Sequence, residues 1–151
     1  MNGNSQQRNT LTRGQLEAAT DAFFSDLVVT PAPSRILLSY FSTSEHVVFE
    51  HAPRQARRSP LYGLNAVRSY FDLLATHWTR YDGVRHRTDV YEGANRVVIF
   101  ASVHWQWRTS GRSWREDFTC TLEFDDHLKI KTFVILTESS PQTCVMHAVD
   151  N

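Results

Sequence analysis

The sequence predicts one α+β domain in which helices cover a curved antiparallel sheet around an apolar pocket. Three observations lead to this fold class. The chain has 151 residues, a length that suits one domain. Helical periodicity fills its first half, and strand alternation fills its second half. Hydrophobic residues make up 41% and aromatic residues 12%, which is enough for a core and too much for a disordered chain.

The expected domain occupies 13–140, between a disordered N-terminal tail at 1–12 and a C-terminal tail at 141–151. Sixteen basic residues balance sixteen acidic ones, which argues against a nucleic-acid partner. The N-terminus lacks the apolar segment of a signal peptide, and no apolar run approaches the roughly 20 residues that span a bilayer. We therefore expect a cytoplasmic protein without a membrane partner. The two cysteines, which form no CxxC motif, fit that compartment.

Three helices are expected before residue 79. The first runs from Thr12 to about Val28 and is ended by the Pro31–Pro33 pair. A short second helix covers Ser34–Phe41, and the third covers Leu64–Trp78. Apolar residues at helical spacing form one face of the first helix and one face of the third: Leu16, Ala19, Phe23 and Leu27, then Leu64, Val67, Phe71, Leu74 and Trp78.

Five strands are expected. The first covers His46–Glu50 and is followed by a basic, proline-bounded loop over 52–60. The other four cover about 84–91, 96–108, 113–124 and 128–138. Runs of alternating apolar and polar residues in these last strands predict hairpins with one buried face.

The middle hairpin predicts its own register. If Ser110 and Gly111 form a two-residue turn, each pair of facing residues lies on one side of the sheet. The pairs on the concave side are then Trp107–Trp114, Trp105–Glu116, Val103–Phe118, Ala101–Cys120, Ile99–Leu122 and Val97–Phe124. Only Glu116 in this set is polar, and that consistency supports the register.

The opposite side of this hairpin carries a His104–Asp117 pair, which resembles part of a catalytic dyad but lies on the outer face. The next hairpin, with a loop at 125–127, divides its residues between the two sides. It adds Leu128, Ile130, Val134 and Leu136 to the apolar side and Lys129, Lys131, Phe133 and Ile135 to the outer side. A broad sheet face of mixed polar and aromatic composition is typical of a subunit interface. We therefore expect a homodimer through the outer sheet face.

This order of elements resembles the nuclear-transport-factor-2-like superfamily from Gln15 to Glu138. The segments HVVFEHAP, GLNAVRSYF and FTCTLEFDDHLKIKTFVI are similar to its SnoaL-like branch, which includes small stand-alone proteins without an assigned activity. The resemblance implies a cone: a curved, mainly antiparallel sheet, with helices over its concave face and a pocket opening at one end. The superfamily includes cyclases, isomerases, hydrolases, dehydratases and non-enzymatic dimers, so the fold does not select a reaction.

A comparison with ketosteroid isomerase, a member of that superfamily, implies a catalytic carboxylate without an oxyanion hole. Its general base, which precedes a proline-containing loop, matches Glu50 with a one-residue gap. Its tyrosine donor matches Phe23 or Phe24, and its protonated aspartate matches Cys120. These residues donate weakly or not at all, so steroid-type isomerisation is not expected.

Glu50, His86 and Glu116 are the candidate catalytic residues. Glu116 lies against tryptophans, where the pKa of a carboxyl rises as a general acid requires, unless it sits at a solvated rim. Glu50 faces the pocket if its strand is regular, or else pairs with Arg54 at the strand end. His86 faces inward as a proton-transfer group, or is a hydrogen-bonded core or edge histidine. His51 faces away from the pocket unless the strand bulges.

The pocket wall is expected to be aromatic, which suits an apolar or polycyclic ligand. The candidate ligand-binding residues, some of which must instead fill the core, are Tyr40, Tyr70, Trp78, Trp105, Trp107, Trp114, Phe118 and Cys120. The seven histidines form no HxH or HExxH motif, and no glycine-rich phosphate loop occurs. Neither a metal nor a cofactor is expected.

Two functions remain open. The first is a small-molecule-binding protein that acts as a cofactor-independent isomerase, cyclase or dehydratase by acid–base chemistry. The second is a non-catalytic homodimer that binds a ligand or a protein partner. The direction and mutual distance of Glu50, His86 and Glu116 discriminate between them.

Overall fold

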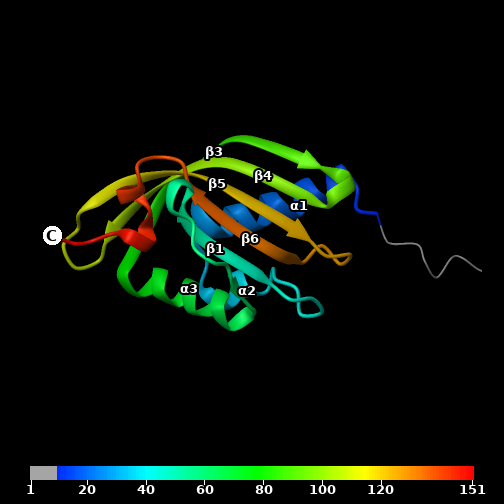
Figure 1. The fold of residues 1–151 in the computed structure, drawn as a ribbon, viewed down its shortest axis with the longest axis horizontal. Helices are drawn as coiled ribbons and strands as arrows, with labels where there is room; N and C mark the ends of the chain where they lie inside the picture. Colours follow the sequence, from blue (N-terminus) through cyan, green and yellow to red (C-terminus); the bar gives the residue numbers. More distant parts are fainter. Residues whose placement is uncertain (1–9) are drawn as a thin grey trace, which may run out of the picture.

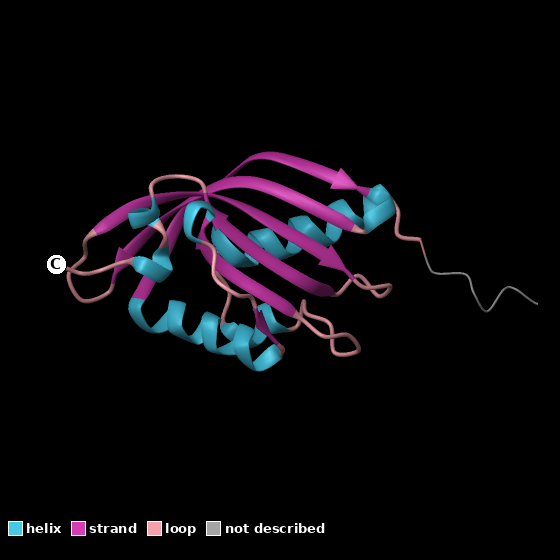
Figure 2. Ribbon diagram, viewed as in Figure 1, coloured by secondary structure: helices cyan, strands magenta, loops and turns pink. Residues whose placement is uncertain are grey.

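The computed structural model describes residues 10–151, which form helices packed on one six-stranded sheet. The sheet is a curved layer with the helices on its concave side (Figures 1 and 2). Residues 1–9 of the expected N-terminal tail lie outside the described residues, and Leu11 is already buried in the core. The elements are α1 (Arg13–Phe24), α2 (Ser34–Leu38), β1 (Val48–Pro53), β2 (Leu61–Tyr62), α3 (Leu64–His77), β3 (Trp78–Tyr91), β4 (Arg96–Trp107), β5 (Ser113–Phe124) and β6 (Ile130–Thr137).

The strands follow the order β2-β1-β6-β5-β4-β3. β1 runs parallel to β6, and all other neighbours are antiparallel, so the sheet is mixed. Parallel neighbours need a long connection, and here α3 and four strands separate β1 from β6 in the sequence. The predicted α+β class with a curved, mixed sheet is confirmed.

α1 begins at a capping box, in which the side chains of Thr12 and Gln15 each accept a hydrogen bond from the other's backbone N–H. The chain then continues through a π-helical turn, Ser25–Val29, before the two prolines. Together these two pieces match the single helix expected up to about Val28. None of the helices in residues 10–151 is long and apolar enough to cross a membrane.

Gly83 lets β3 pass close to the π-helical turn. A Cβ atom at this position would lie 2.6 Å from both the carbonyl oxygen and Cγ2 of Val28. No side chain fits into such a gap, so only glycine allows the sheet to wrap this tightly around the end of α1.

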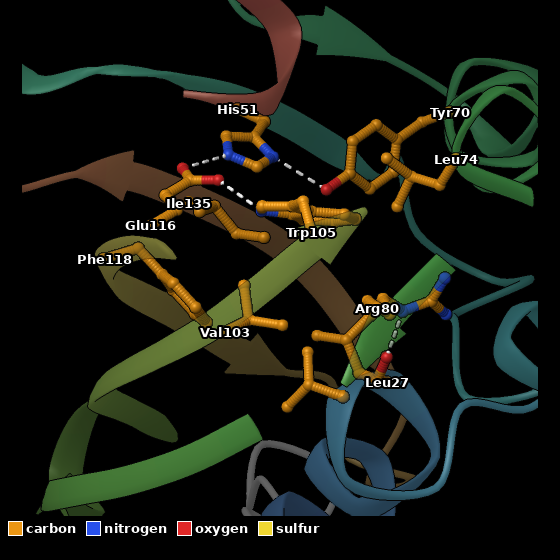
Figure 3. A pocket seen from close by; sticks show the side chains of 11 residues that line it. Leu27, His51, Tyr70, Leu74, Arg80, Val103, Trp105, Glu116, Phe118 and Ile135 are labelled. Carbon is orange, nitrogen blue, oxygen red and sulfur yellow. Dashed lines mark hydrogen bonds and ion pairs between the residues drawn. The ribbon is translucent and has the colours of Figure 1, made fainter. Parts of the chain in front are cut away.

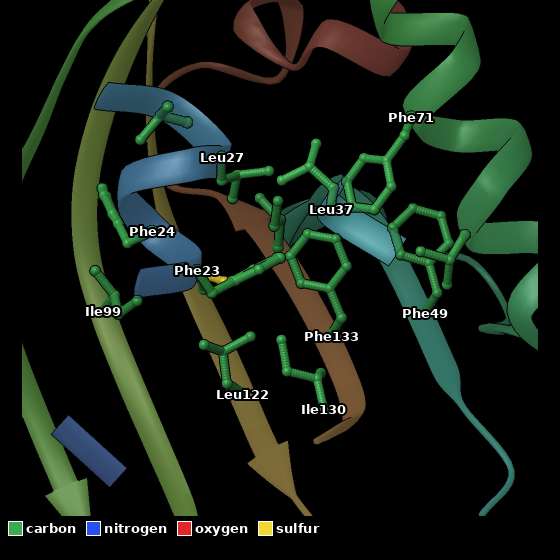
Figure 4. Packing of buried hydrophobic residues seen from close by; sticks show 14 of the residues in the cluster. Phe23, Phe24, Leu27, Leu37, Phe49, Phe71, Ile99, Leu122, Ile130 and Phe133 are labelled. Carbon is green, nitrogen blue, oxygen red and sulfur yellow. The ribbon is translucent and has the colours of Figure 1, made fainter. Parts of the chain in front are cut away.

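Aromatic rings form the centre of the core (Figure 4). Phe133 of β6 lies among three other rings: Phe23 of α1, Phe41, which follows α2, and Phe71 of α3. Their ring centroids are 5.5, 5.6 and 6.0 Å from that of Phe133. All four side chains are buried. Edge-on contacts, such as those of Phe133 with Phe23 and Phe41, add to the hydrophobic stabilisation of the core.

The β4–β5 hairpin has the predicted faces but not the predicted register. Trp105 pairs with Trp114, and Val103 pairs with Glu116, two residues away from the expected partners. The cause is the loop, which spans 108–112 instead of two residues. Because the offset is even, the apolar set remains on the concave side.

The faces predicted for β6 are wrong. Phe133 and Ile135 lie on the concave side, 0% and 4% exposed, and Val134 and Leu136 lie on the other side. The pairing shifts by one residue at the end of β5, and one extra residue reverses every side chain beyond it. Ile130 precedes the shift in the ladder and is buried as predicted.

The C-terminal residues pack against the end of the sheet, although a tail was expected over 141–151. Two 3-10 turns, Pro141–Thr143 and Val145–His147, follow β6. Cys144 and Val145 are 0% and 1% exposed, so they belong to the core. Figure 1 shows this segment in red, close to the end of α3 that leads into β3.

Candidate active site

A carboxyl, an imidazole and a phenol form a buried hydrogen-bonded chain on the concave side of the sheet (Figure 3). Nε2 of His51 lies 2.8 Å from Oε2 of Glu116, and Nδ1 of His51 lies 2.7 Å from the hydroxyl oxygen of Tyr70. The three residues come from β1, β5 and α3, and each is buried. The structure thus places Glu116 inward, as the hairpin predicted, and at 0% exposure it is not at a solvated rim.

Four donors hold the Glu116 carboxylate in one orientation. Oε2 accepts from His51 and from the hydroxyl of Thr137 at 2.7 Å. Oε1 accepts from the indole N–H of Trp105 at 2.9 Å and from the backbone N–H of Val145 at 3.3 Å. Each oxygen therefore has both lone-pair directions occupied, as a buried carboxylate requires.

The surroundings of His51 favour its protonated form. Burial by itself would lower the pKa of this imidazole, but the oxygens of Tyr70 and Glu116 outweigh burial and raise the pKa well above its usual range. Burial raises the pKa of Tyr70, and His51 partly offsets that effect. Both directions favour a proton on each ring nitrogen of His51 and on the phenolic oxygen of Tyr70.

The chain borders a small, mostly apolar cavity. Its volume is about 10 Å³, which is room for a single water molecule. His51, Tyr70 and Glu116 line it together with Arg80 and with apolar side chains, among them Leu27, Val28, Leu74, Val103, Trp105, Phe118 and Ile135. Arg80 donates to the carbonyl oxygen of Leu27 at 2.5 Å, and burial lowers the pKa of its guanidinium.

Glu50 does not point into this cavity, so the expected direction is wrong. It pairs with Val134 of β6, whose side chain lies on the outer side of the sheet. Its carboxylate accepts two hydrogen bonds from Arg57, at 2.6 and 3.1 Å, and not from Arg54. Neighbouring residues of a strand face opposite ways, so His51 takes the inward position that was expected for Glu50.

His86 also lies on the outer side. It is the extra residue at a bulge in β3, between Arg85 and Arg87, and its Nε2 lies 3.0 Å from the hydroxyl of Ser102. The bulge turns it away from the inward direction that regular alternation predicts. His86 therefore lies across the sheet from Glu116 and does not meet it.

The expected His104–Asp117 pair does not form. His104 faces Arg115 on the neighbouring strand, and Asp117 faces Ser102, because the hairpin register differs by two residues. The ring of His104 instead stacks on Tyr81, with centroids 5.3 Å apart.

The residues predicted to form an aromatic wall lie in several separate parts of the structure. Tyr70, Trp105 and Phe118 line the cavity. Trp78 and Trp107 line a separate hollow at the surface. The other predicted residues do not line the cavity: Tyr40 bonds to Asp26, Trp114 donates to the carbonyl of Thr143, and Cys120 is a buried thiol whose pKa burial raises to about 12.

His51, Thr137 and Cys144 are the residues at this site that the sequence did not indicate. His51 was placed on the wrong face, although its alternation with Phe49, a core residue, is a signal for an inward direction. Ligand atoms of His51, Glu116 and Cys144 lie within 4.8 Å of one another and could hold a metal ion. Such an ion would have to displace hydrogen bonds that already fill the Glu116 carboxylate.

Solved structures share this fold at low sequence identity. BvnE pinacolase from Penicillium brevicompactum matches with a TM-score of 0.69 and 16% identity, over 84% of this chain and 85% of that one. The epoxide hydrolase/cyclase-like enzyme SalBIII, described in pyran ring formation in the polyether salinomycin, matches with a TM-score of 0.70 and 11% identity, over 85% and 94%. An NTF2-like protein of unknown function from Exiguobacterium sp. 255-15 matches with a TM-score of 0.60 and 15% identity, over 83% and 99%.

No family model and no curated protein matches the chain. The structural matches show that it has the nuclear-transport-factor-2-like fold, as its sequence resemblance implied.

Proposed function

We propose that this protein is a cofactor-independent isomerase or cyclase that transfers a proton to or from a small apolar substrate. The observation that carries the proposal is the Tyr70–His51–Glu116 chain at an apolar cavity. A carboxylate that orients an imidazole, which in turn serves a hydroxyl, is a general arrangement for proton transfer. Proteins of the same fold named as a pinacolase and a cyclase-like enzyme agree with this class of chemistry.

The geometry gives each member of the chain a role. A doubly protonated His51 donates from Nδ1 to the oxygen of Tyr70, which leaves the phenolic O–H free to donate to a ligand oxygen in the cavity. As that proton passes to the substrate, the Nδ1 proton of His51 passes to the phenolate oxygen. Glu116 stabilises the imidazolium before the transfer and orients the ring throughout.

The test is proton exchange that depends on these residues. Purified protein is incubated in D2O with a panel of apolar cyclic ketones, epoxides and vicinal diols, and deuterium incorporation and rearranged products are followed by NMR. We expect Tyr70→Phe and Glu116→Gln to abolish turnover, and Glu123→Gln, which alters an exposed ion pair with Arg96, to retain it. Full turnover in Tyr70→Phe and Glu116→Gln would refute the proposal.

The small size of the cavity, which holds no more than one water molecule, favours a second function, that of a non-catalytic binding module. A non-catalytic module that binds a ligand or a protein needs the hydrogen-bonded chain only for stability. In either case we propose a homodimer through the outer sheet face, where Tyr81 and Val84 are 38% and 47% exposed.

A further inference from the structure

The segment Cys144–Ala148 packs against the hydrogen-bonded chain at the end of the sheet. The backbone N–H of Val145 donates to Glu116, and Sγ of Cys144 lies within 4.8 Å of the reacting atoms of His51 and Glu116. Both residues of the segment that make these contacts are buried. With the segment in place, the side chain of Glu116 is fully buried.

Hollows flank the same segment on two sides. One, of about 290 Å³, is lined by His51 and Glu50 from β1 and by Met146 and His147. The other, of about 220 Å³, is lined by Trp78 and Trp107 and again by Met146. Met146 borders both hollows, and His51 borders both the first hollow and the central cavity. The segment is therefore the wall between the two hollows, and His51 separates the first hollow from the central cavity.

The segment is joined to the rest of the fold by few hydrogen bonds. It contains a single 3-10 turn, and neither it nor the turn before it belongs to the sheet or to a longer helix. Before it, the carbonyl of Thr143 accepts from Trp114. After it, Asp150 accepts from Thr109 and Ser110 in the exposed hairpin loop. Segments held in this way open locally at a smaller free-energy cost than global unfolding.

We propose that Cys144–Ala148 is a displaceable lid, and that its withdrawal joins both hollows into one binding site for an apolar ligand, with His51 in its wall and Glu116 uncovered. The size of the ligand follows from the two hollows, which are much larger than the closed cavity. The indole N–H of Trp78 is a buried donor without a partner in residues 10–151, so the ligand also carries a hydrogen-bond acceptor. That this ligand is a substrate rests on the proposed function, whereas the opening of the lid does not.

The two cysteines provide a matched test of lid opening. Cys120 and Cys144 are 2% and 0% exposed, but Cys120 lies in the middle of β5 and Cys144 lies in the lid. Single-cysteine variants, Cys144→Ala and Cys120→Ala, are labelled with dithiobis(nitrobenzoate) under native conditions and at low urea concentrations. We expect the Cys144 thiol to react about 100-fold faster than the Cys120 thiol, at a rate that low urea leaves nearly unchanged. Equal rates that both rise with urea as global unfolding does would overturn the lid.

Asp150→Ala tests the attachment of the lid. Asp89→Ala is its control, because Asp89 is an aspartate of β3 that accepts from Arg87 of the same strand. We expect Asp150→Ala to speed labelling of Cys144 by about three- to tenfold without affecting Cys120, and Asp89→Ala to change neither rate. The same rate of Cys144 labelling in Asp150→Ala and wild type would contradict this attachment and the lid with it.

Anilinonaphthalene sulfonate, an apolar bicyclic anion, tests the binding site itself. We expect one molecule to bind per chain, about threefold or more tightly to Asp150→Ala than to wild type, with unchanged near-ultraviolet circular dichroism. Equal affinity for both proteins would overturn the ligand site. The failure of the lid and the failure of the proposed function give different results. If the lid opens but turnover survives Glu116→Gln, this inference stands and the proposed function is refuted.

Discussion

Nε2 of His51 lies 2.8 Å from Oε2 of Glu116, and the two side chains are 2% and 0% exposed. An ion pair this deeply buried is stable only because every other lone pair and proton is also bonded, here through Trp105, Thr137 and Tyr70. The pair joins β1 to β5 across β6, so the chemistry of the site and the stability of the sheet depend on the same atoms.

Glu116→Gln is expected to lower the free energy of unfolding by about 3–5 kcal/mol. The amide places an N–H₂ group among four donors and leaves a buried imidazolium without its counter-charge. Urea unfolding followed by tryptophan fluorescence measures the loss. Glu123→Gln is the control: its partner Arg96 is 43% exposed, so we expect a loss below about 1 kcal/mol. Equal losses in the two variants would mean that the buried pair contributes no more than a surface pair.

The stability should depend on pH through His51. Its pKa is raised in the folded protein, so its stabilising contribution is complete below the unfolded-state pKa of about 6.5 and is lost as pH rises through the folded-state value. The difference in unfolding free energy between wild type and His51→Gln should therefore shrink from about pH 6.5 upward. Urea titrations across that range measure it, and a constant difference would contradict the raised pKa.

Tyr70→Phe removes only the hydroxyl from the chain. The ring keeps its packing against Phe49, so we expect a loss of about 1–2 kcal/mol in stability and a complete loss of turnover. Tyr40→Phe is the matched control, because its hydroxyl bonds to Asp26 away from the cavity. We expect it to retain activity. Should both variants turn over substrate alike, Tyr70 is not the terminal acid.

Gly83→Ala tests the close passage of β3 past Val28. A methyl group there would overlap the backbone of the π-helical turn, so we expect a loss of about 1–3 kcal/mol. Gly93→Ala, where nothing lies within 4 Å of the added carbon, should change stability by less than about 0.5 kcal/mol. Thermal unfolding of the two variants compares them, and a neutral Gly83→Ala would show that the turn yields easily.

The proposed dimer can be broken by a charge on the outer sheet face. Val84 is 47% exposed on that side, and Val84→Glu should give a monomer by light scattering at micromolar concentration. Ile36→Glu, at an exposed position of α2, should leave the oligomeric state unchanged. A monomeric wild type would contradict the dimer altogether.

The fold was predictable because its signals are local. The apolar stripe of α3 follows from helical spacing alone. The apolar face of the β4–β5 hairpin is the same in the predicted and the observed register, because the two registers differ by an even number of residues. The errors arose where one residue was inserted. The bulge beside His86 and the shift at the end of β5 each reversed the faces that alternation predicts.

The site was only partly predictable, for a different reason. Glu116 stood out as a lone carboxyl on an apolar hairpin face. Its partner His51 is selected by the parallel pairing of β1 with β6, which no local pattern specifies. Val145 comes from a segment with weak periodicity, and its burial depends on contacts that exist only in the assembled sheet.

The position of β1 has a consequence for synthesis of the chain. β1 enters the sheet only by pairing with β6, so a ribosome-bound chain has no place for it until residue 137 has emerged. Until then Phe49 and the apolar half of β1 lack their neighbour on that side of the strand. We therefore expect the emergence of β6 from the ribosome to be the event that brings His51 and Glu116 together, and truncation before β6 to leave an aggregating product.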